Sequence, residues 1–338
     1  MQLQENISLK RFNTFGIDVA AQYFSQFETV GQLKELLLFA AKEELIHMAL
    51  GGGSNVLFTK NVNGLVLKNE LKGIEIINED EAFYYVKVAA GENWHQFVLH
   101  SINNHWAGLE NLSLIPGSVG ASPMQNIGAY GMEIEQVFYE LEALHINEGT
   151  IEKFSKKDCA FGYRESVFKR KYKGQFIILN VTYQLRKKPA FNTSYGAIDQ
   201  ELEKMGVKEL SIKAISDAVI AIRSSKLPNP TEIGNAGSFF KNPEVSRDTF
   251  EQLKSEFPTI VGFQLDNSNV KLAAGWLIEQ CGWKGYRKGD AGCHAKQALV
   301  LLNYGHATGK EVYDLSTAIL QNVTEKFGIT LEREVNVL

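Results

Sequence analysis

The sequence is poor in cysteine, and its cysteines do not suggest a cross-linked or metal-bound framework. Its 338 residues include three, Cys159, Cys281 and Cys293. This odd number, without CxxC spacing, argues against a set of disulfides or a ribbon-type zinc site. Cys293 lies beside His294, a pair that suggests metal ligands, but free cysteine more often packs as a small hydrophobe. We therefore expect buried structural thiols and no metal.

Long apolar runs and an excess of basic charge are also absent. No uninterrupted apolar stretch reaches the roughly 18 residues that a membrane-spanning helix needs, and the opening segment MQLQENISLKRF has no apolar signal region. The net charge is −4 and the pI is near 6.0, with lysine and arginine scattered along the chain. Such a chain lacks the basic surface that binds nucleic acid. We expect a cytoplasmic protein that binds neither membranes nor nucleic acid.

The composition is that of a globular protein of two or three domains, with 44% hydrophobic and 22% charged residues. Residues 32–46 repeat apolar side chains at i, i+3 and i+4, which predicts an amphipathic helix. A short buried strand, IHMAL, follows at 46–50. Residues 56–69 form two β-rich runs separated by Asn63-Gly64, which predicts a hairpin.

A glycine-rich loop, LGGGSNVLF at 50–58, lies between the strand and these runs. The dinucleotide fingerprint requires a third glycine where Val56 stands and a helix after the loop, and the Walker A loop requires Gly-Lys-Ser/Thr. Neither pattern is present. Glycine lets backbone approach a ligand closely, so we predict a nest of backbone N–H groups that binds an anion. A plain tight turn is the alternative.

A second glycine-rich segment, IPGSVGASPMQNIGAYG, occupies 115–131. It is too irregular for a helix or a strand pair, and loops of this length inside a domain are usually either functional or disordered. Its apolar residues favour order. Two nests in one domain fit a long ligand with a pyrophosphate, such as FAD.

The rest of the chain alternates strands and helices. Residues 138–185 are strand-rich, and a helix at 215–226 ends before Pro228 and Pro230, which cannot continue it. Further predicted elements are helices at 248–257, 269–281 and 312–327, a strand at 297–303 and an alternating terminal strand at 329–337.

Seven motifs occur in order over nearly the whole chain and together resemble the UDP-N-acetylenolpyruvoylglucosamine reductase family. They are NTFGID, LGGGSNVLF, IPGSVGASPMQNIGAYG, FGYRES, RSSKLPNP, GNAGSFFKNP and LEREV. The resemblance implies an α+β chain with a two-part FAD-binding fold of the vanillyl-alcohol-oxidase/PCMH type and a smaller α+β substrate-binding domain. The implied FAD-binding subdomains are 1–70, completed by the terminal strand 329–338, and 71–224. The implied substrate-binding domain is 225–328.

The family's chemistry implies an NADPH-dependent oxidoreductase that acts on a CH–CH bond. NADPH reduces noncovalently bound FAD, which passes hydride to UDP-N-acetylglucosamine enolpyruvate and forms UDP-N-acetylmuramate for peptidoglycan synthesis. We expect a monomer whose partners are these small molecules. Two alternatives stay open, an FAD-dependent sugar or alcohol oxidase of the same fold and a non-catalytic nucleotide-binding protein.

The resemblance also assigns site residues. Ser238 is the implied proton donor, Arg164 faces the substrate carboxylate, and Glu334 either stabilises the enediolate as an acid or anchors Arg164. The implied FAD-binding residues are Gly51, Gly52, Gly53, Ser54, Asn55, Pro116, Gly117, Ser118, Gly120, Gln125, Asn126 and Gly128.

Substrate-binding residues follow from the same resemblance. Tyr195, in FNTSYGAI, matches the tyrosine loop of the long, type I members, and with Lys226 and Asn242 it is implied to hold the UDP diphosphate. Arg223, Tyr163 and Gln297 are further implied substrate contacts. For Arg223 and Lys226, favourable placement of cations at a helix C-terminus is the alternative.

Overall fold

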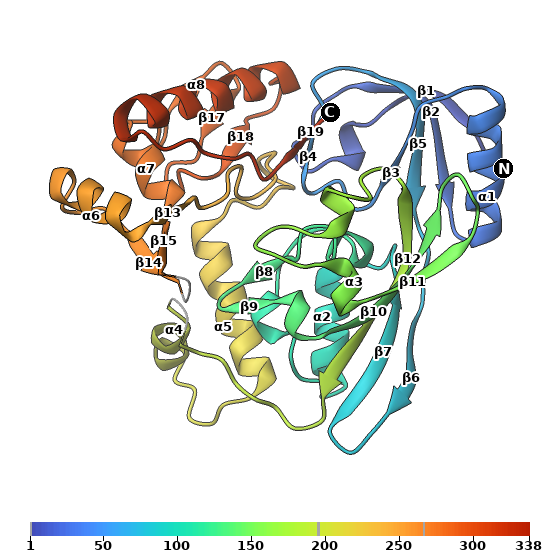
Figure 1. Cartoon of the computed structure of the whole chain (residues 1–338), viewed down its shortest axis with the longest axis horizontal. Helices are drawn as coiled ribbons and strands as arrows, with labels where there is room; N and C mark the ends of the chain where they lie inside the picture. The colour runs from blue at the N-terminus through green and yellow to red at the C-terminus, as the bar shows by residue number, and fades with distance from the viewer. Residues whose placement is uncertain (1, 195–196, 266–267) are drawn as a thin grey trace. The chain divides into compact units, whose positions relative to one another are not determined.

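The computed structural model describes residues 2–194, 197–265 and 268–338, so Tyr195 lies outside the described residues. The chain forms two compact units. The first unit comprises Met1–Ile7, Ala21–Gly52 and Val62–Ser225, and the second unit comprises Ser8–Ala20, Gly53–Asn61 and Lys226–Leu338. Figure 1 colours the chain from blue at the N-terminus to red at the C-terminus.

One sheet of the first unit has the order β1-β2-β5-β3. Its strands are β1 (Gln4–Ser8), β2 (Ala20–Phe27), β5 (Val62–Asn69) and β3 (His47–Leu50). Helix α1 (Val30–Lys42) connects β2 to β3, and both strands pair in parallel with β5. The Thr29 side chain caps α1, which buries one apolar face, as its sequence predicts.

The predicted hairpin at Asn63-Gly64 is wrong. Strand β5 continues through these residues with an irregularity in its pairing with β2, and from Leu65 onward it is paired in parallel with both β2 and β3. Gly64 serves a close approach: a Cβ there would overlap the Ile46 carbonyl, which accepts a hydrogen bond from the Leu65 N–H at 2.8 Å. Only a side chain's absence permits that contact.

The other large sheet of the first unit is antiparallel, with the order β11-β10-β12-β7-β6. Its strands are β6 (Ile74–Glu79), β7 (Phe83–Ala89), β10 (Phe138–His145), β11 (Ile151–Ser155) and β12 (Phe176–Arg186). Helix α2 (Trp94–Asn103) contributes to its core, where Trp94, Phe97 and Tyr183 pack ring against ring. The strand-rich pattern predicted for 138–185 is confirmed.

Helices α4 (Ile198–Lys204) and α5 (Ile212–Lys226) bury a smaller apolar cluster. Shorter elements complete the first unit: η2 (Glu110–Leu112), η3 (Val119–Ala121), β8 (Gly128–Ala129), β9 (Met132–Glu133), η4 (Ile134–Gln136), α3 (Lys156–Cys159) and η5 (Val167–Lys169).

The described residues of the second unit form three small sheets. They are β13 (Glu244–Ser246), β15 (Asn269–Leu272) and β14 (Gly262–Gln264); β16 (Arg287–Lys288), β17 (Ala291–Cys293) and β18 (Leu301–Asn303); and β4 (Val56–Leu57) with β19 (Asn336–Val337). Its helices are η1 (Lys10–Phe12), α6 (Arg247–Glu256), α7 (Ala274–Gln280) and α8 (Gly309–Phe327).

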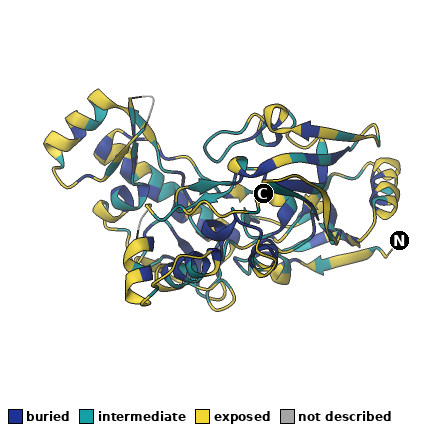
Figure 2. Cartoon of the chain, turned by 90° about the horizontal axis from the view of Figure 1, so that it is seen from below, coloured by how far each residue is buried: buried dark blue, intermediate teal, exposed yellow. Residues whose placement is uncertain are grey.

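Helix α8 shows why these residues are helical. Thr308 and Glu311 form a capping box at its start, and Gly328 ends it in the left-handed conformation. Its buried residues include the predicted apolar face, Val312, Leu315, Ile319, Val323 and Phe327. Exposed residues lie on turns, on edge strands such as β1 and β6 and on one face of each long helix, while buried residues lie on the opposite helix faces (Figure 2).

The helix predicted at 269–281 is only half right. Residues Asn269–Leu272 form the central strand β15, and α7 begins at Ala274. Pairing decides this, because β15 has β13 on one side and β14 on the other.

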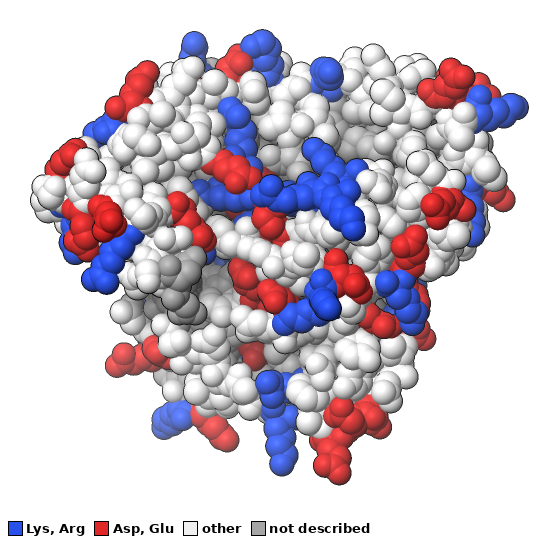
Figure 3. All heavy atoms as spheres, viewed as in Figure 1, with Lys and Arg blue, Asp and Glu red and all other residues white. Residues whose placement is uncertain are grey.

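The surface carries charges of both signs. On the face drawn in Figure 3, acidic and basic side chains are scattered among uncharged ones, which make up most of the surface. Some are paired along helices, as in Lys310–Asp314 and Lys213–Asp217. No helix in the described residues is both long and apolar enough to cross a membrane.

Candidate active site

The two glycine-rich loops meet in the first unit. A Cβ on Gly51 would overlap the Ser118 hydroxyl, and one on Gly52 would lie 2.7 Å from the Gly117 Cα. Gly117 has a φ of +117°, and its carbonyl accepts a hydrogen bond from the Trp94 N–H at 3.0 Å. The structure therefore brings together the two segments that the sequence assigns to one ligand, and at Gly52, which faces backbone, only glycine fits.

The second loop is ordered by short elements and buried contacts, as its sequence predicts. It contains η3 and the two-residue strand β8. A Cβ on Gly120 would lie 2.5 Å from the Ala90 Cβ, and Asn126 is fully buried with a φ of +45°. Packing therefore holds the segment at Gly120 and Asn126.

The remainder of the first glycine-rich loop belongs to the second unit. Gly53 has a φ of +63°, and a Cβ there would overlap the Phe12 carbonyl. The Asn55 side-chain amide donates to the Glu334 carbonyl at 3.2 Å, and the Asn55 carbonyl accepts a hydrogen bond from the Asn336 N–H at 3.1 Å. These contacts attach the end of the loop to the terminal segment that carries Glu334.

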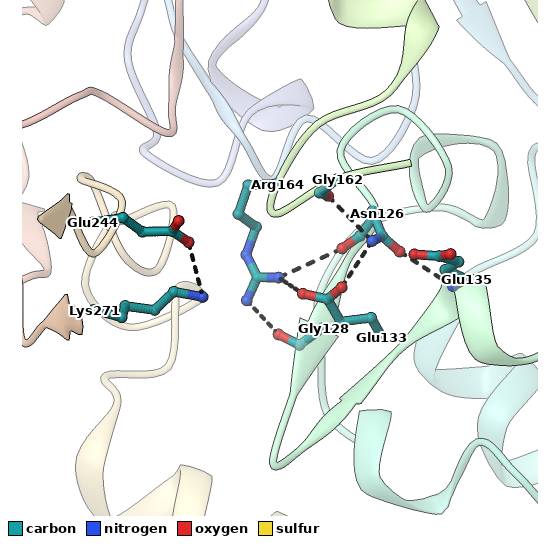
Figure 4. A network of polar contacts seen from close by, with 8 residues as sticks. All are labelled: Asn126, Gly128, Glu133, Glu135, Gly162, Arg164, Glu244 and Lys271. Carbon is teal, nitrogen blue, oxygen red and sulfur yellow. Dashed lines mark hydrogen bonds and ion pairs between the residues drawn. The ribbon is translucent and has the colours of Figure 1, made fainter. Parts of the chain in front are cut away.

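Arg164 lies in a tight turn of the first unit and is held by the second loop (Figure 4). Its backbone has a φ of +56°, and Gly162 and Glu165 pair across the turn. One Nη donates to the Gly128 carbonyl at 2.6 Å, and the other lies 3.5 Å from the Glu133 carboxylate. A left-handed conformation costs a non-glycine residue about 1–3 kcal/mol. The contacts around Arg164 must offset this strain to hold its backbone in that conformation.

Glu133, which the sequence interpretation missed, contacts two of the predicted site residues. Its carboxylate contacts Arg164 and accepts a hydrogen bond from the Asn126 amide at 2.9 Å. The Asn126 amide also donates to the Gly162 carbonyl, and the Asn126 side-chain oxygen accepts from the Glu135 N–H. No motif marks Glu133, but a half-buried arginine requires a counter-charge, and that requirement was the available signal.

Arg223 lies in the last turn of α5, as the sequence predicts. Its Nε is buried without a hydrogen-bond partner, and no ion pair joins it within the described ranges. Burial lowers the pKa of Arg223. Burial, followed by the Arg223 charge, also lowers the pKa of His95, whose Nδ1 accepts a hydrogen bond from the Leu114 N–H. A desolvated cation of this kind favours an anionic ligand.

Ser238 and Glu334 occupy neighbouring segments of the second unit. Ser238 pairs with Val300 in an isolated bridge, and the Phe239 carbonyl accepts a hydrogen bond from the Glu334 N–H at 2.9 Å. Ser238 is half-buried, and its hydroxyl has no hydrogen-bond partner among the residues that the structure describes. The alternation predicted for the terminal segment is confirmed by its buried members, Ile329, Leu331 and Val335, although only Asn336–Val337 is a strand.

The other predicted substrate contacts are placed as follows. The Asn242 side-chain oxygen accepts from the Ala274 N–H at 3.0 Å, at the start of α7, and the Gln297 side-chain oxygen accepts from the Leu299 N–H at 3.4 Å. Lys226 is exposed. The Tyr163 ring lies under the Arg164 guanidinium, 5.1 Å from its centre.

The cysteines are free thiols. Burial raises the pKa of both Cys159 and Cys293 to about 12, so both remain protonated at neutral pH. The Cys293 thiol donates to the Ala298 carbonyl at 3.1 Å. Cys281 departs from the expected burial because it caps the C-terminus of α7 and is partly exposed.

Comparisons with known proteins define the class first. Residues 21–155 match the family described as FAD binding domain, and they include the contact between the two glycine-rich loops. The chain is therefore a flavoprotein with a two-part FAD-binding fold, and the predicted α+β fold is confirmed.

Similarity over the whole chain identifies the particular family. Residues 229–338 match the C-terminal domain of UDP-N-acetylenolpyruvoylglucosamine reductase. The chain is 53% identical to the protein of that name from Amoebophilus asiaticus and 50% identical to that from Flavobacterium johnsoniae, each over 100% of both chains. It belongs to the UDP-N-acetylenolpyruvoylglucosamine reductase family.

A solved structure shows the same fold. The crystal structure of the reductase from Thermus caldophilus aligns with a TM-score of 0.70 at 23% identity, covering 100% of this chain and 99% of that one.

Proposed function

We propose that the protein reduces UDP-N-acetylglucosamine enolpyruvate to UDP-N-acetylmuramate with electrons from NADPH. The observation that carries this proposal is the adjacency of the Ser238 and Glu334 segments in a chain of this family. We further propose that it acts as a cytoplasmic monomer in peptidoglycan precursor synthesis. The domain limits 1–70 with 329–338, 71–224 and 225–328 belong to the same proposal.

The glycine-rich loops fit FAD. Gly51 and Gly52 leave space that any side chain would fill against Gly117 and Ser118, so backbone N–H groups are able to approach a pyrophosphate. Bound FAD supplies the transfer of hydride from NADPH to the substrate. Neither loop contains histidine or cysteine, which supports noncovalent attachment.

Ser238 and Glu334 suit the proton-transfer half of the reaction. Hydride addition to the enolpyruvyl CH2 leaves negative charge on the carbon beside the carboxylate, delocalised as an enediolate. The Ser238 hydroxyl, which has no partner in the described chain, donates its proton to that carbon. Glu334 stabilises the enediolate as an acid, and Arg164 pairs with the substrate carboxylate. A preorganised donor at such a charge commonly contributes about 3–4 kcal/mol.

The remaining polar residues suit the nucleotide sugar. Lys226, Asn242 and Tyr195 bind the diphosphate in this proposal, while Tyr163 and Gln297 contact the substrate. Arg223 supplies a desolvated positive charge for an anionic group. We prefer this role to the alternative, in which Arg223 only stabilises the C-terminus of its helix.

Anaerobic stopped-flow absorbance tests the proposal directly. NADPH should bleach the flavin, and UDP-N-acetylglucosamine enolpyruvate should restore its colour without oxygen. An FAD-dependent sugar or alcohol oxidase would instead be reduced by its sugar or alcohol and reoxidised by oxygen. Failure of the enolpyruvyl compound to reoxidise the flavin would refute the reductase assignment.

A further inference from the structure

Arg333 precedes Glu334, and its guanidinium is attached to helix α8 by two hydrogen bonds. Its Nε donates to the Ser316 hydroxyl at 2.8 Å, and one Nη donates to the Thr317 hydroxyl at 2.7 Å. The guanidinium carbon lies 4.6 Å from the centre of the Tyr313 ring. All these groups belong to the second unit.

The acceptors are themselves fixed. The Ser316 and Thr317 hydroxyls both donate to the Tyr313 carbonyl, at 2.6 and 3.0 Å, and Ser316 is fully buried. Because each hydroxyl donates its own hydrogen to that carbonyl, its oxygen is oriented to accept a hydrogen bond from Arg333. The helix that carries both hydroxyls is capped at its N-terminus. Because the guanidinium is a rigid planar fork, two bonds and a stacked ring determine its orientation.

The backbone around Glu334 is held as well. The Glu334 N–H donates to the Phe239 carbonyl, its carbonyl accepts from the Asn55 amide, and Arg333 pairs with Phe240 in an isolated bridge. Neighbouring side chains in an extended segment point to opposite faces. A side chain that fixes Arg333 to α8 therefore also fixes the direction in which Glu334 leaves the backbone.

We propose that Arg333 is a positioning residue for Glu334: its attachment to α8 sets the placement of the carboxylate. This inference rests on the catalytic role proposed for Glu334. Displacement of a reacting group by about 1 Å can slow a reaction roughly 100-fold, so loss of the attachment should slow the step that uses Glu334 and spare the step that does not.

The test is a double-mutant cycle on the FAD-loaded protein. Arg333→Met keeps the aliphatic stem but removes both hydrogen bonds and the charge. It should slow flavin reoxidation by saturating enolpyruvyl substrate about 10- to 100-fold, while reduction by NADPH stays within about twofold of wild type. Arg333→Lys, which retains the cation over Tyr313, should recover part of the rate.

Glu334→Gln supplies the second arm of the cycle. If Arg333 acts through Glu334, adding Arg333→Met to Glu334→Gln should slow reoxidation less than about twofold further. Equal slowing in both backgrounds would overturn the inference. If Glu334→Gln alone reoxidises at the wild-type rate, the proposed role of Glu334 fails instead, so the two failures are distinguishable.

Arg287→Met is the matched structural control. The Arg287 guanidinium carbon lies 4.0 Å from the Tyr304 ring centre, and the side chain donates to the Gly289 carbonyl and the Asp290 carboxylate. Thermal unfolding measures the stability loss of each arginine variant, and only Arg333→Met should slow reoxidation. Equal slowing by Arg287→Met would mean that a general loss of stability explains the effect.

Discussion

At the scale of single residues, the proposed chemistry depends on how each side chain is restrained. Arg164 is tied to Gly128 and Glu133, whereas the Ser238 hydroxyl has no partner in the chain as described. A restrained cation suits binding in a fixed direction, and an available hydroxyl suits proton donation.

Ser238→Ala should separate the two half-reactions. Reduction of the flavin by NADPH needs no proton from Ser238, so bleaching should remain near the wild-type rate. Reoxidation by the enolpyruvyl sugar should slow by several orders of magnitude, because the enediolate carbon loses its proton donor. Stopped-flow absorbance measures both rates. Reoxidation within about tenfold of wild type, roughly 1.4 kcal/mol, would show that another group donates the proton.

Glu133→Gln should weaken substrate binding through Arg164. The variant removes the carboxylate that lies 3.5 Å from the guanidinium but leaves the Gly128 carbonyl in place. We expect the Michaelis constant for the enolpyruvyl sugar to rise about 3- to 30-fold, or roughly 0.7–2 kcal/mol. Steady-state kinetics would show it. Glu165→Gln, in the same turn and paired with Arg170, is the control; an equal rise there would contradict a specific role for Glu133.

At the scale of elements, two features can be tested directly: the contact between the two glycine-rich loops and the N-terminal cap of helix α8. Gly51 and Gly52 face Gly117 and Ser118 without room for a side chain, and α8 begins at a reciprocal capping box.

Gly52→Ala should impair FAD binding. The new Cβ would lie 2.7 Å from the Gly117 Cα, a backbone atom that cannot rotate away, so the loops must separate. The ratio of flavin to protein absorbance after purification should fall well below that of wild type. Gly31→Ala in α1 places its Cβ at an ordinary 3.8 Å from Thr29 and should keep its flavin. Full flavin content in Gly52→Ala would refute the role of this contact.

Thr308→Ala should destabilise the second unit without changing the chemistry. It removes the side chain that accepts the Glu311 N–H at 3.2 Å, and loss of such a cap costs about 0.5–2 kcal/mol. Denaturant unfolding should show a lower midpoint, while flavin reoxidation at 25 °C stays unchanged. An unchanged midpoint would mean that the cap contributes little to this helix.

At the scale of the whole molecule, the flavin should be held without a covalent bond. Acid precipitation should release all the yellow colour into the supernatant, because neither glycine-rich loop offers a histidine or cysteine for attachment. Absorbance of the supernatant and of the redissolved pellet measures the division. Colour retained in the pellet would contradict noncovalent binding.

The sequence by itself determined the features that depend on local chemistry. The apolar faces of α1 and α8, the end of α5 before Pro228 and the glycine-rich loops all follow from spacing and backbone freedom. The ordered motifs also predicted the family, which the full-length relatives confirm.

Only the tertiary structure decided what depends on pairing between distant segments. Parallel neighbours on both sides made a strand of 62–69 despite its turn signal, and flanking strands made β15 from residues predicted as helix. Glu133 and Arg333 gained their proposed roles in the same way, from contacts with Arg164 and with α8. Local sequence patterns indicate which residues of a segment can be buried and where a helix can be capped. Contacts with segments that are distant in sequence leave no such pattern, so only the folded structure shows them.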